Sequence, residues 1–321
     1  MSLVLVTGAT GLVGRATCTR FARGGYQVRR ALRRTENRLD TVSGTIQDVV
    51  VGDIDAATDW REALRGVDTV VHLAARVHVM DEQAADPLAA FRLLNVQATE
   101  HLARLAAEQA VRRFIFVSSI KVNGEATSGA PFTEADQPNP QDAYAVSKWE
   151  AEQALWQVAR ENGLEVVVIR PPLIYGPGVQ GNFRRLLKLV SAGIPLPLAN
   201  LPNQRSLLGV ENLADLLFVC SQHPAAANKT FLAADGADLS TTELLQKIAV
   251  AMQKRARLFS MPLFLLKLLG GLCGKTAELD RLLGSLRIDS RQVCRTLDWQ
   301  PPFSVEAGLQ RTLDGFQEDS P

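Results

Sequence analysis

The sequence predicts an α/β fold, in which a doubly wound parallel sheet carries a smaller C-terminal lobe. Short continuous apolar runs, beginning with residues 3–6, are typical of parallel strands that are buried on both faces. These runs alternate with helix-like segments, and the first one leads directly into a glycine-rich loop at residues 7–14. A chain of 321 residues is long enough to bury a large core. Together these features predict a Rossmann-like, dinucleotide-binding architecture.

The composition indicates a globular protein that does not bind nucleic acid. Hydrophobic residues make up 46% of the chain, and a net charge of +1 lacks the basic excess of nucleic-acid-binding domains. The four cysteines are far apart and form no Cys-x-x-Cys motif, so neither a metal site nor a disulfide framework is predicted.

Because no targeting segment is recognisable, we expect a cytoplasmic protein. No signal peptide is expected, because a strand pattern starts at Leu3. The most apolar segment, residues 261–273, is too short to span a bilayer and contains Lys267. We therefore expect no membrane insertion, and we interpret this segment as a packed helix or a subunit contact. A role at a membrane surface is the alternative.

The first strand, the glycine loop and the helix that follows through Ala22 form a phosphate-binding unit. Glycines let the backbone turn tightly and approach a pyrophosphate, and the start of the helix offers free N–H groups. The candidate cofactor-binding residues in this unit are Gly8, Thr10, Gly11, Leu12, Val13 and Gly14.

The second strand, residues 27–32, bears on the choice of cofactor. An acid near its end would bind the ribose 2′-hydroxyl of NAD, whereas an arginine accommodates the 2′-phosphate of NADP. The strand is followed by Arg33 and Arg34, with no acid before Glu36. We therefore expect NADP(H), bound by Arg33 and secondarily by Arg34, with NAD(H) possible. A solvated basic loop is the competing interpretation.

Two further strands are predicted at residues 48–53 and 68–73, with a short helix at 60–64 between them. His72 is expected to be a packed strand-end histidine rather than a catalyst. The candidates for contact with the cofactor are Asp53 and Ile54 at the adenine edge and the strand-end residues Leu73, Ala74 and Ala75.

The next strand, residues 113–119, ends in two hydroxyls, Ser118 and Ser119, and strand ends are where doubly wound sheets place their ligands. A helix is predicted for residues 140–162, which puts Tyr144 and Lys148 on one face. An ammonium about 4 Å from the phenol would favour the phenolate by about 4 kcal/mol, or roughly three pKa units. The pair therefore predicts a proton-transfer device, with two ordinary exposed side chains as the alternative.

The rest of the chain divides between two lobes. A sixth strand is predicted at residues 164–170 and a last one at 231–236, and a capping box at 240–243 opens a helix through Met252. Glycines and prolines mark residues 176–202 as an excursion from the sheet. The predicted division is a dinucleotide-binding domain of residues 1–175 and 208–236 and a smaller lobe of residues 176–207 and 237–321.

Taken in order, four motifs resemble the extended short-chain dehydrogenase/reductase family, that is, the NAD(P)-dependent epimerase/dehydratase family. They are the glycine loop, His72-Leu73-Ala74-Ala75, Ser118-Ser119 and the Tyr144/Lys148 pair. Residues 170–178 and Asn182-Phe183 look like those of enzymes that act on nucleotide sugars. The resemblance implies that Ser119 bonds the sugar 4-oxygen, that Tyr144 donates or accepts its proton, and that Lys148 tunes Tyr144 and holds the nicotinamide ribose.

The same resemblance implies further contacts. It places Asn95 in a helix behind the active site, assigned with Pro171 to the cofactor, and it places Ser118 and Lys121 beside the sugar. The diphosphate of the substrate is assigned to Asn182 and Arg205, with Arg281 as a further candidate whose spacing fits the family poorly.

The function that this resemblance favours is NADPH-dependent reduction of a UDP-linked 4-keto-6-deoxy-(N-acetyl)hexosamine in surface-polysaccharide (O-antigen) synthesis. The alternative is a UDP-glucose or UDP-N-acetylglucosamine 4-epimerase with tightly bound NAD. Lys121 and Asn123 depart from the pattern of many epimerases, which counts against that alternative. A non-enzymatic NADP-sensing protein is a third hypothesis, which the presence of Ser119, Tyr144 and Lys148 disfavours. A homodimer is the usual assembly of the family.

Overall fold

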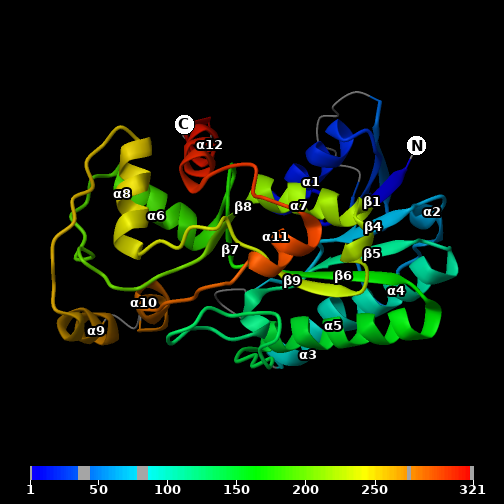
Figure 1. Cartoon of the computed structure of the whole chain (residues 1–321), viewed down its shortest axis with the longest axis horizontal. Helices are drawn as coiled ribbons and strands as arrows, with labels where there is room; N and C mark the ends of the chain where they lie inside the picture. The colour runs from blue at the N-terminus through cyan, green and yellow to red at the C-terminus, as the bar shows by residue number, and fades with distance from the viewer. Residues whose placement is uncertain (1, 35–43, 78–85, 273–275, 319–321) are drawn as a thin grey trace.

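The computed structural model describes residues 2–34, 44–77, 86–272 and 276–318. A seven-stranded sheet with helices on both faces adjoins a smaller lobe (Figure 1). The sheet order is β3-β2-β1-β4-β5-β6-β9, and all neighbouring strands are parallel. The strands are β1 (Leu3–Thr7), β2 (Gln27–Leu32), β3 (Ile46–Val50), β4 (Thr69–His72), β5 (Arg113–Val117), β6 (Glu165–Arg170) and β9 (Lys229–Leu232), with β7 (Leu173–Tyr175) and β8 (Leu207–Gly209) in a separate two-stranded sheet.

The helices cover both faces of the large sheet and build most of the smaller lobe. Those around the large sheet are α1 (Leu12–Arg23), α2 (Arg61–Leu64), α3 (Pro87–Arg92), the π-helical turn η2 (Leu93–Gln97), α4 (Ala98–Glu108), the 3₁₀ turn η3 (Ile120–Val122), α5 (Ala143–Asn162), α7 (Val210–Gln222), the 3₁₀ turn η4 (Pro224–Ala226) and α11 (Arg291–Leu297). Those of the smaller lobe are α6 (Gly181–Ser191), α8 (Thr241–Ala251), α9 (Leu263–Leu272), α10 (Thr276–Leu283) and α12 (Val305–Glu318).

The sheet explains where a ligand can bind. The chain builds outward from β1 to β2 and β3, then returns to place β4 on the other side of β1. Helix α1 packs with α7 on one face, and α4 and α5 pack on the other. At such a reversal of strand order a crevice opens over the carboxyl ends of the strands. The predicted glycine loop and strand-end motifs follow β1, β4 and β5 at that edge.

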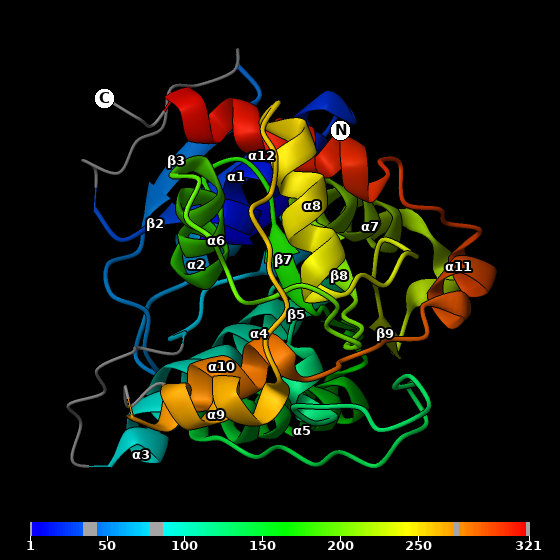
Figure 2. The ribbon, with the colours of Figure 1, turned by 90° about the vertical axis from the view of Figure 1, so that its left-hand side faces the viewer.

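The smaller lobe has its own apolar core. Tyr175, Phe183 and Leu245 are fully or almost fully buried there, between the two-stranded sheet and α6, α8 and α12. The predicted capping box is present at the start of α8, because Ser240 and Glu243 bond each other's backbone N–H groups. Viewed from the end of this lobe, α9 and α10 face outward (Figure 2). In the described parts of the chain, no helix is both long and apolar enough to span a bilayer.

Three boundaries differ from the sequence expectations. Helix α5 begins at Ala143 rather than at residue 140, because the Asp142 carboxylate caps it by accepting from the backbone N–H of Ala145. The third strand is shifted towards the amino terminus, to Ile46–Val50. The last strand ends at Leu232, because Asp235 turns away from the sheet to accept hydrogen bonds from the Gly209 N–H, the Tyr175 hydroxyl and the Asn212 amide.

Residues 291–299, which were predicted to belong to the smaller lobe, pack against the dinucleotide-binding lobe. Val293 and Leu297 of α11 and the following Trp299 are buried in the same core as β1 and α7. The indole of Trp299 donates to Asp215 of α7 at 2.9 Å. The chain therefore returns to the dinucleotide-binding lobe before α12, whereas the predicted division assigned all of residues 237–321 to the smaller lobe.

Candidate active site

The glycine loop is folded so tightly that side chains are excluded. A Cβ atom on Gly14 would lie 2.2 Å from the Gly8 carbonyl oxygen, and one on Gly8 would lie 2.8 Å from the Ala74 nitrogen. Gly8 also has φ of +64°, which favours glycine. Gly11 caps α1 without a side-chain acceptor for its first N–H groups. A loop held this closely by Gly8 and Gly14, at the start of a helix with free N–H groups, fits the pyrophosphate of a dinucleotide.

A buried network that the sequence did not reveal joins the ends of β1 and β4. The Thr7 hydroxyl accepts from the backbone N–H groups of Leu73 and Ala74, both at 3.1 Å, and lies 2.8 Å from Nδ1 of His72. The other ring nitrogen of His72 lies 2.9 Å from the hydroxyl of Thr99 on α4. Burial, followed by the charge of Lys148, lowers the pKa of His72 to about 3. His72 is therefore a neutral packed residue, as expected, that fixes the predicted cofactor contacts Leu73 and Ala74.

The adenosine end of the predicted cofactor site carries exposed charges. Arg33 follows β2, and its Nε lies 2.8 Å from a carboxylate oxygen of Asp53. Both side chains are more than half exposed, as is expected of groups available to a ligand. Within the sheet below, Arg30 forms a buried two-point ion pair with Asp48 on β3, at 2.6 and 3.0 Å. This pair holds β3 against β2 and so positions the loop with Asp53.

The three predicted catalytic residues come from the end of β5 and the start of α5. Ser119 follows this strand, and Tyr144 lies in the first turn of α5. Lys148, one turn further, is 3% exposed; its ammonium donates to the Val117 carbonyl at 3.0 Å and lies 4.4 Å from the centre of the Phe116 ring. The helix therefore brings Lys148 to within two residues of Ser119 along the strand end.

Burial decides the charge states of this pair. It raises the pKa of Tyr144 to about 12, with a smaller contribution from the Asp142 carboxylate, and it lowers the pKa of Lys148 to about 7, although Glu152 opposes that fall. Burial is the largest cause of both shifts, because it disfavours the charged form of each group. The tuning of Tyr144 by Lys148 stays a prediction.

A buried acid, Glu152, lies on the same helix, α5, as Tyr144 and Lys148. Glu152, which is fully buried and one turn beyond Lys148, accepts from Arg170 at 3.0 Å through Nε and at 2.5 Å through Nη2. It also accepts from the Ser118 hydroxyl, at 2.5 Å. Ser118, predicted to lie beside the sugar, instead points into this network. The spacing of Glu152 four residues after Lys148 is the sequence signal that could have revealed it.

Lys121, predicted to contact the sugar, pairs with two carboxylates within the chain. Its ammonium lies 2.8 Å from a carboxylate oxygen of Glu125 and 2.5 Å from one of Asp142. Because Asp142 caps α5, Lys121 anchors the start of the helix two residues before Tyr144. The structure thus makes Lys121 a positioning residue.

Asn95 also serves the protein framework. It is buried in the π-helical turn η2, and its side-chain oxygen accepts from the Arg76 N–H at 2.8 Å. Its amide nitrogen donates to the Arg76 carbonyl at 3.0 Å and to the Ser147 hydroxyl at 2.9 Å. These bonds fix the loop after β4 to α5, and the cofactor contact of Asn95 stays a prediction.

The predicted diphosphate residues lie in the smaller lobe. Asn182 is exposed in the first turn of α6. Arg205 is held between the lobe's segments, where it donates to the Gly284 carbonyl at 3.1 Å, and burial lowers its pKa. The side chain of Arg281 lies outside the described residues. Over the described part of the chain, no group of His, Cys, Asp and Glu side chains is placed to hold a metal ion.

Comparison with known proteins gives one consistent result. Residues 4–234 match the model of the NAD dependent epimerase/dehydratase family. A UDP-glucose 4-epimerase of Vibrio cholerae is 43% identical over 98% of this chain and 95% of its own length. An N-acetyl-alpha-D-glucosaminyl-diphospho-ditrans,octacis-undecaprenol 4-epimerase of Escherichia coli O157:H7 is 27% identical over 82% of each chain.

Solved structures agree on the fold. A UDP-N-acetylglucosamine 4-epimerase from Bacillus cereus superposes with a TM-score of 0.78 at 21% identity, covering 100% of this chain and 99% of its own. The protein MoeE5, in complex with UDP-glucuronic acid and NAD, gives 0.77 at 22% identity and covers 99% of both chains. At these identities the likeness concerns the fold alone.

Proposed function

The chain belongs to the NAD dependent epimerase/dehydratase family, and we propose that it interconverts the C4 epimers of a UDP-linked hexose or N-acetylhexosamine. The observation that supports this proposal is that Lys148, one helical turn after Tyr144 on α5, donates to the Val117 carbonyl at the end of β5, two residues before Ser119. The 43% identity to the Vibrio cholerae enzyme, across nearly all of both chains, favours epimerisation among the reactions of the family.

The bound nicotinamide would accept and return the hydride at C4. The chain's part is to move the proton on the 4-oxygen. With its pKa raised to about 12, Tyr144 is protonated at neutral pH and is suited to donate that proton. A cation beside the phenol ring of Tyr144 would lower the pKa of that phenol and allow Tyr144 to take the proton back. The Ser119 hydroxyl is a second donor to the same oxygen, and Asn182 and Arg205 would bind the diphosphate.

A second reaction, NADPH-dependent reduction of a UDP-4-keto-6-deoxy-(N-acetyl)hexosamine in O-antigen synthesis, is favoured by a different observation. Arg33 and Arg34 follow β2 with exposed side chains, and two guanidinium groups at this position suit the 2′-phosphate of NADP. An epimerase that retains NAD does not need them. Replacing both by alanine should weaken binding of NADPH far more than binding of NADH.

One experiment separates the two reactions. The purified protein is incubated with UDP-glucose or UDP-N-acetylglucosamine without added cofactor, and the products are resolved by NMR. Epimerisation predicts a mixture of gluco and galacto isomers. In parallel, loss of NADPH absorbance is followed with a UDP-4-keto-6-deoxy-hexosamine. NADPH consumption without epimer formation would select the reductase, and inactivity in both assays would reject the proposed substrate class. Tyr144→Phe is the inactive control for either.

A further inference from the structure

We propose that α9 and the segment before it rest on the surface of a bilayer containing anionic phospholipid. The contact surface, which we call the apolar cap, consists of Phe259, Leu263, Phe264, Leu265 and Leu268. This inference is independent of the reaction proposed above, because it concerns a surface outside the active-site crevice.

The apolar cap is unusual in how much apolar side chain it exposes. Phe264 is 69% exposed and Leu268 is 58% exposed, and because they lie four residues apart they share one face of α9. The exposed fractions of the other three members are between 38% and 45%. A cluster of large apolar side chains on one short segment marks an interaction surface, whereas single exposed ones are common.

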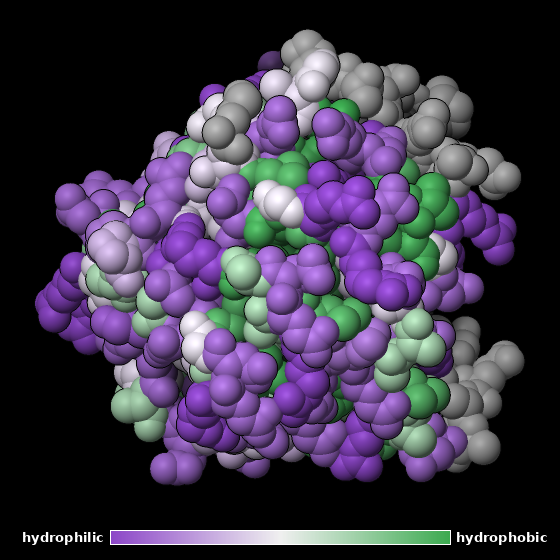
Figure 3. All heavy atoms as spheres, turned by 90° about the vertical axis from the view of Figure 1, so that its right-hand side faces the viewer, coloured by the Kyte–Doolittle hydropathy of each residue, from purple (hydrophilic) through white to green (hydrophobic). Residues whose placement is uncertain are grey.

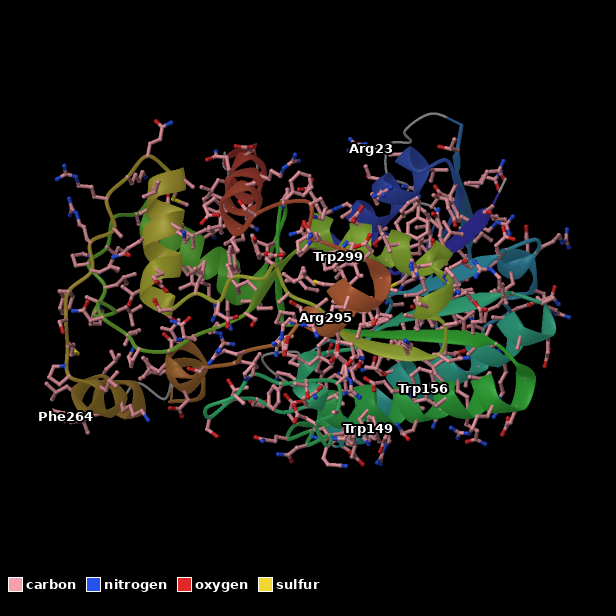
Figure 4. The ribbon with its side chains drawn as sticks, in the orientation of Figure 1. Arg23, Trp149, Trp156, Phe264, Arg295 and Trp299 are labelled. Carbon is pink, nitrogen blue, oxygen red and sulfur yellow. The ribbon has the colours of Figure 1, made fainter. Side chains whose placement is uncertain are left out.

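The position of α9 makes this surface accessible. The helix lies at the end of the smaller lobe furthest from the large sheet (Figure 1), and it faces outward in the end view (Figure 2). The opposite end of the molecule, in contrast, is covered mainly by hydrophilic side chains (Figure 3). Phe264 lies at the outer margin of the lobe (Figure 4). Leu266, at 7% exposure, points inward and anchors α9 to the core of the lobe.

The charges around the cap identify the partner. Lys254, Arg255 and Arg257 are exposed in the segment just before it, and Lys267 is 60% exposed within α9 itself. Its ammonium lies 3.9 Å from Asp280, which offsets part of this basic charge. Apolar side chains flanked by lysine and arginine are the pattern of helices that lie in the interface of anionic membranes.

The length of α9 fixes its orientation. Ten residues span about 15 Å, roughly half the thickness of the hydrocarbon core of a bilayer. The helix therefore lies in the plane of the surface, with Phe264 and Leu268 directed into the acyl boundary. Lys267 on α9 would then be level with the lipid phosphates.

A second copy of the chain is a poorer partner for the same surface. A two-fold contact brings each patch against its own copy. Lys254, Arg255 and Arg257 of the two copies would then be brought towards each other, and this repulsion has no counterpart at an anionic surface.

The test is sedimentation of the full chain with vesicles of phosphatidylcholine, with or without phosphatidylglycerol. We expect binding that requires phosphatidylglycerol and weakens with salt. Phe264→Ser combined with Leu268→Ser should reduce the apparent vesicle affinity about tenfold or more. Val250→Ser is the matched control, because Val250 on α8 is 74% exposed and lies outside the cap. Thermal unfolding of each variant checks that the fold is retained.

Three results would overturn the inference. One is a wild-type chain that stays in the supernatant with anionic vesicles. Another is a folded double variant that sediments as well as the wild type. The third is a wild-type chain that is a dimer in gel filtration and a double variant that is a monomer, with neither protein binding vesicles. That result would assign the cap to self-association.

Discussion

Replacing Glu152 by glutamine should destabilise the protein strongly, because it removes the carboxylate charge that balances the buried guanidinium of Arg170. Glu152 is fully buried and Arg170 is 4% exposed. The carboxylate accepts two hydrogen bonds from the guanidinium and a third from Ser118. Glutamine keeps one acceptor oxygen but presents an NH₂ group, so at least one of these donors loses its acceptor, and the charge of Arg170 is no longer balanced.

The expected cost follows from this geometry. Breaking a buried, hydrogen-bonded ion pair by removing one partner costs about 3–5 kcal/mol. For a chain of this size that corresponds to a melting temperature lower by roughly 4–8 °C. Changing both partners, with Glu152→Gln and Arg170→Met together, should cost less than the single change, because no unpaired charge is then buried.

The assay is urea unfolding of Glu152→Gln beside a matched exposed pair. Glu161 on the same helix pairs with Arg104 at 2.8 Å, but both side chains are substantially exposed. Glu161→Gln should therefore leave the free energy of unfolding nearly unchanged. A Glu152→Gln protein that unfolds within about 1 kcal/mol of the wild type would refute the reasoning, since it would mean that Arg170 finds other compensation.

The same variant has an electrostatic readout at the active site. The charge of Glu152 raises the pKa of Lys148 and so opposes the effect of burial. Without that charge the pKa of Lys148 falls below about 7, and the alkaline limb of the pH profile of kcat/KM should move to lower pH. A merely structural role for Glu152 would lower activity without moving this limb.

Three further changes test the site. Tyr144→Phe should lower turnover by about 10²–10⁴-fold without weakening cofactor binding in fluorescence titrations, whereas full turnover would remove Tyr144 from proton transfer. Gly14→Ala should weaken cofactor binding, because the added Cβ would lie 2.2 Å from the Gly8 carbonyl oxygen. Gly271→Ala is the control: a Cβ at this position meets no atom within 4 Å, so cofactor binding should not change. The pKa of Lys148 is about 7 when folded and ordinarily 10.5, so the unfolded chain binds the extra proton between these values. The free energy of unfolding should therefore rise with pH across that window, and in urea titrations Lys148→Met should lose this part of the rise, while an unchanged slope would contradict the burial of the charge.

Local patterns were enough to predict the frame of the fold. The strands at residues 27–32 and 3–6 and the capping box at Ser240 are each encoded by a few neighbouring residues. The glycine loop could be predicted for the same reason, because only glycine permits its backbone contacts. Element boundaries were predicted less well, as at the start of α5, where the side chain of Asp142 caps the helix.

The partners of individual side chains could not be predicted in this way. Lys121 was expected beside the sugar, and its pairing with Asp142, 21 residues later, was not predicted. Asn95 was expected at the cofactor, and its bonds to Arg76 and Ser147 were not predicted. Trp299 was assigned to the smaller lobe, but it is buried against the sheet. In each case the contact joins segments that are remote in sequence.

By itself, the sequence determined which groups could transfer a proton and what cradle could hold a dinucleotide, because helical spacing and glycine backbones are local properties. Only the tertiary structure decided the charge states of those groups. The spacing of Tyr144 and Lys148 predicts attraction, but their burial beneath the end of β5 raises the pKa of the phenol and lowers that of the ammonium. Desolvation depends on everything packed around a group, and that is fixed only when distant segments meet.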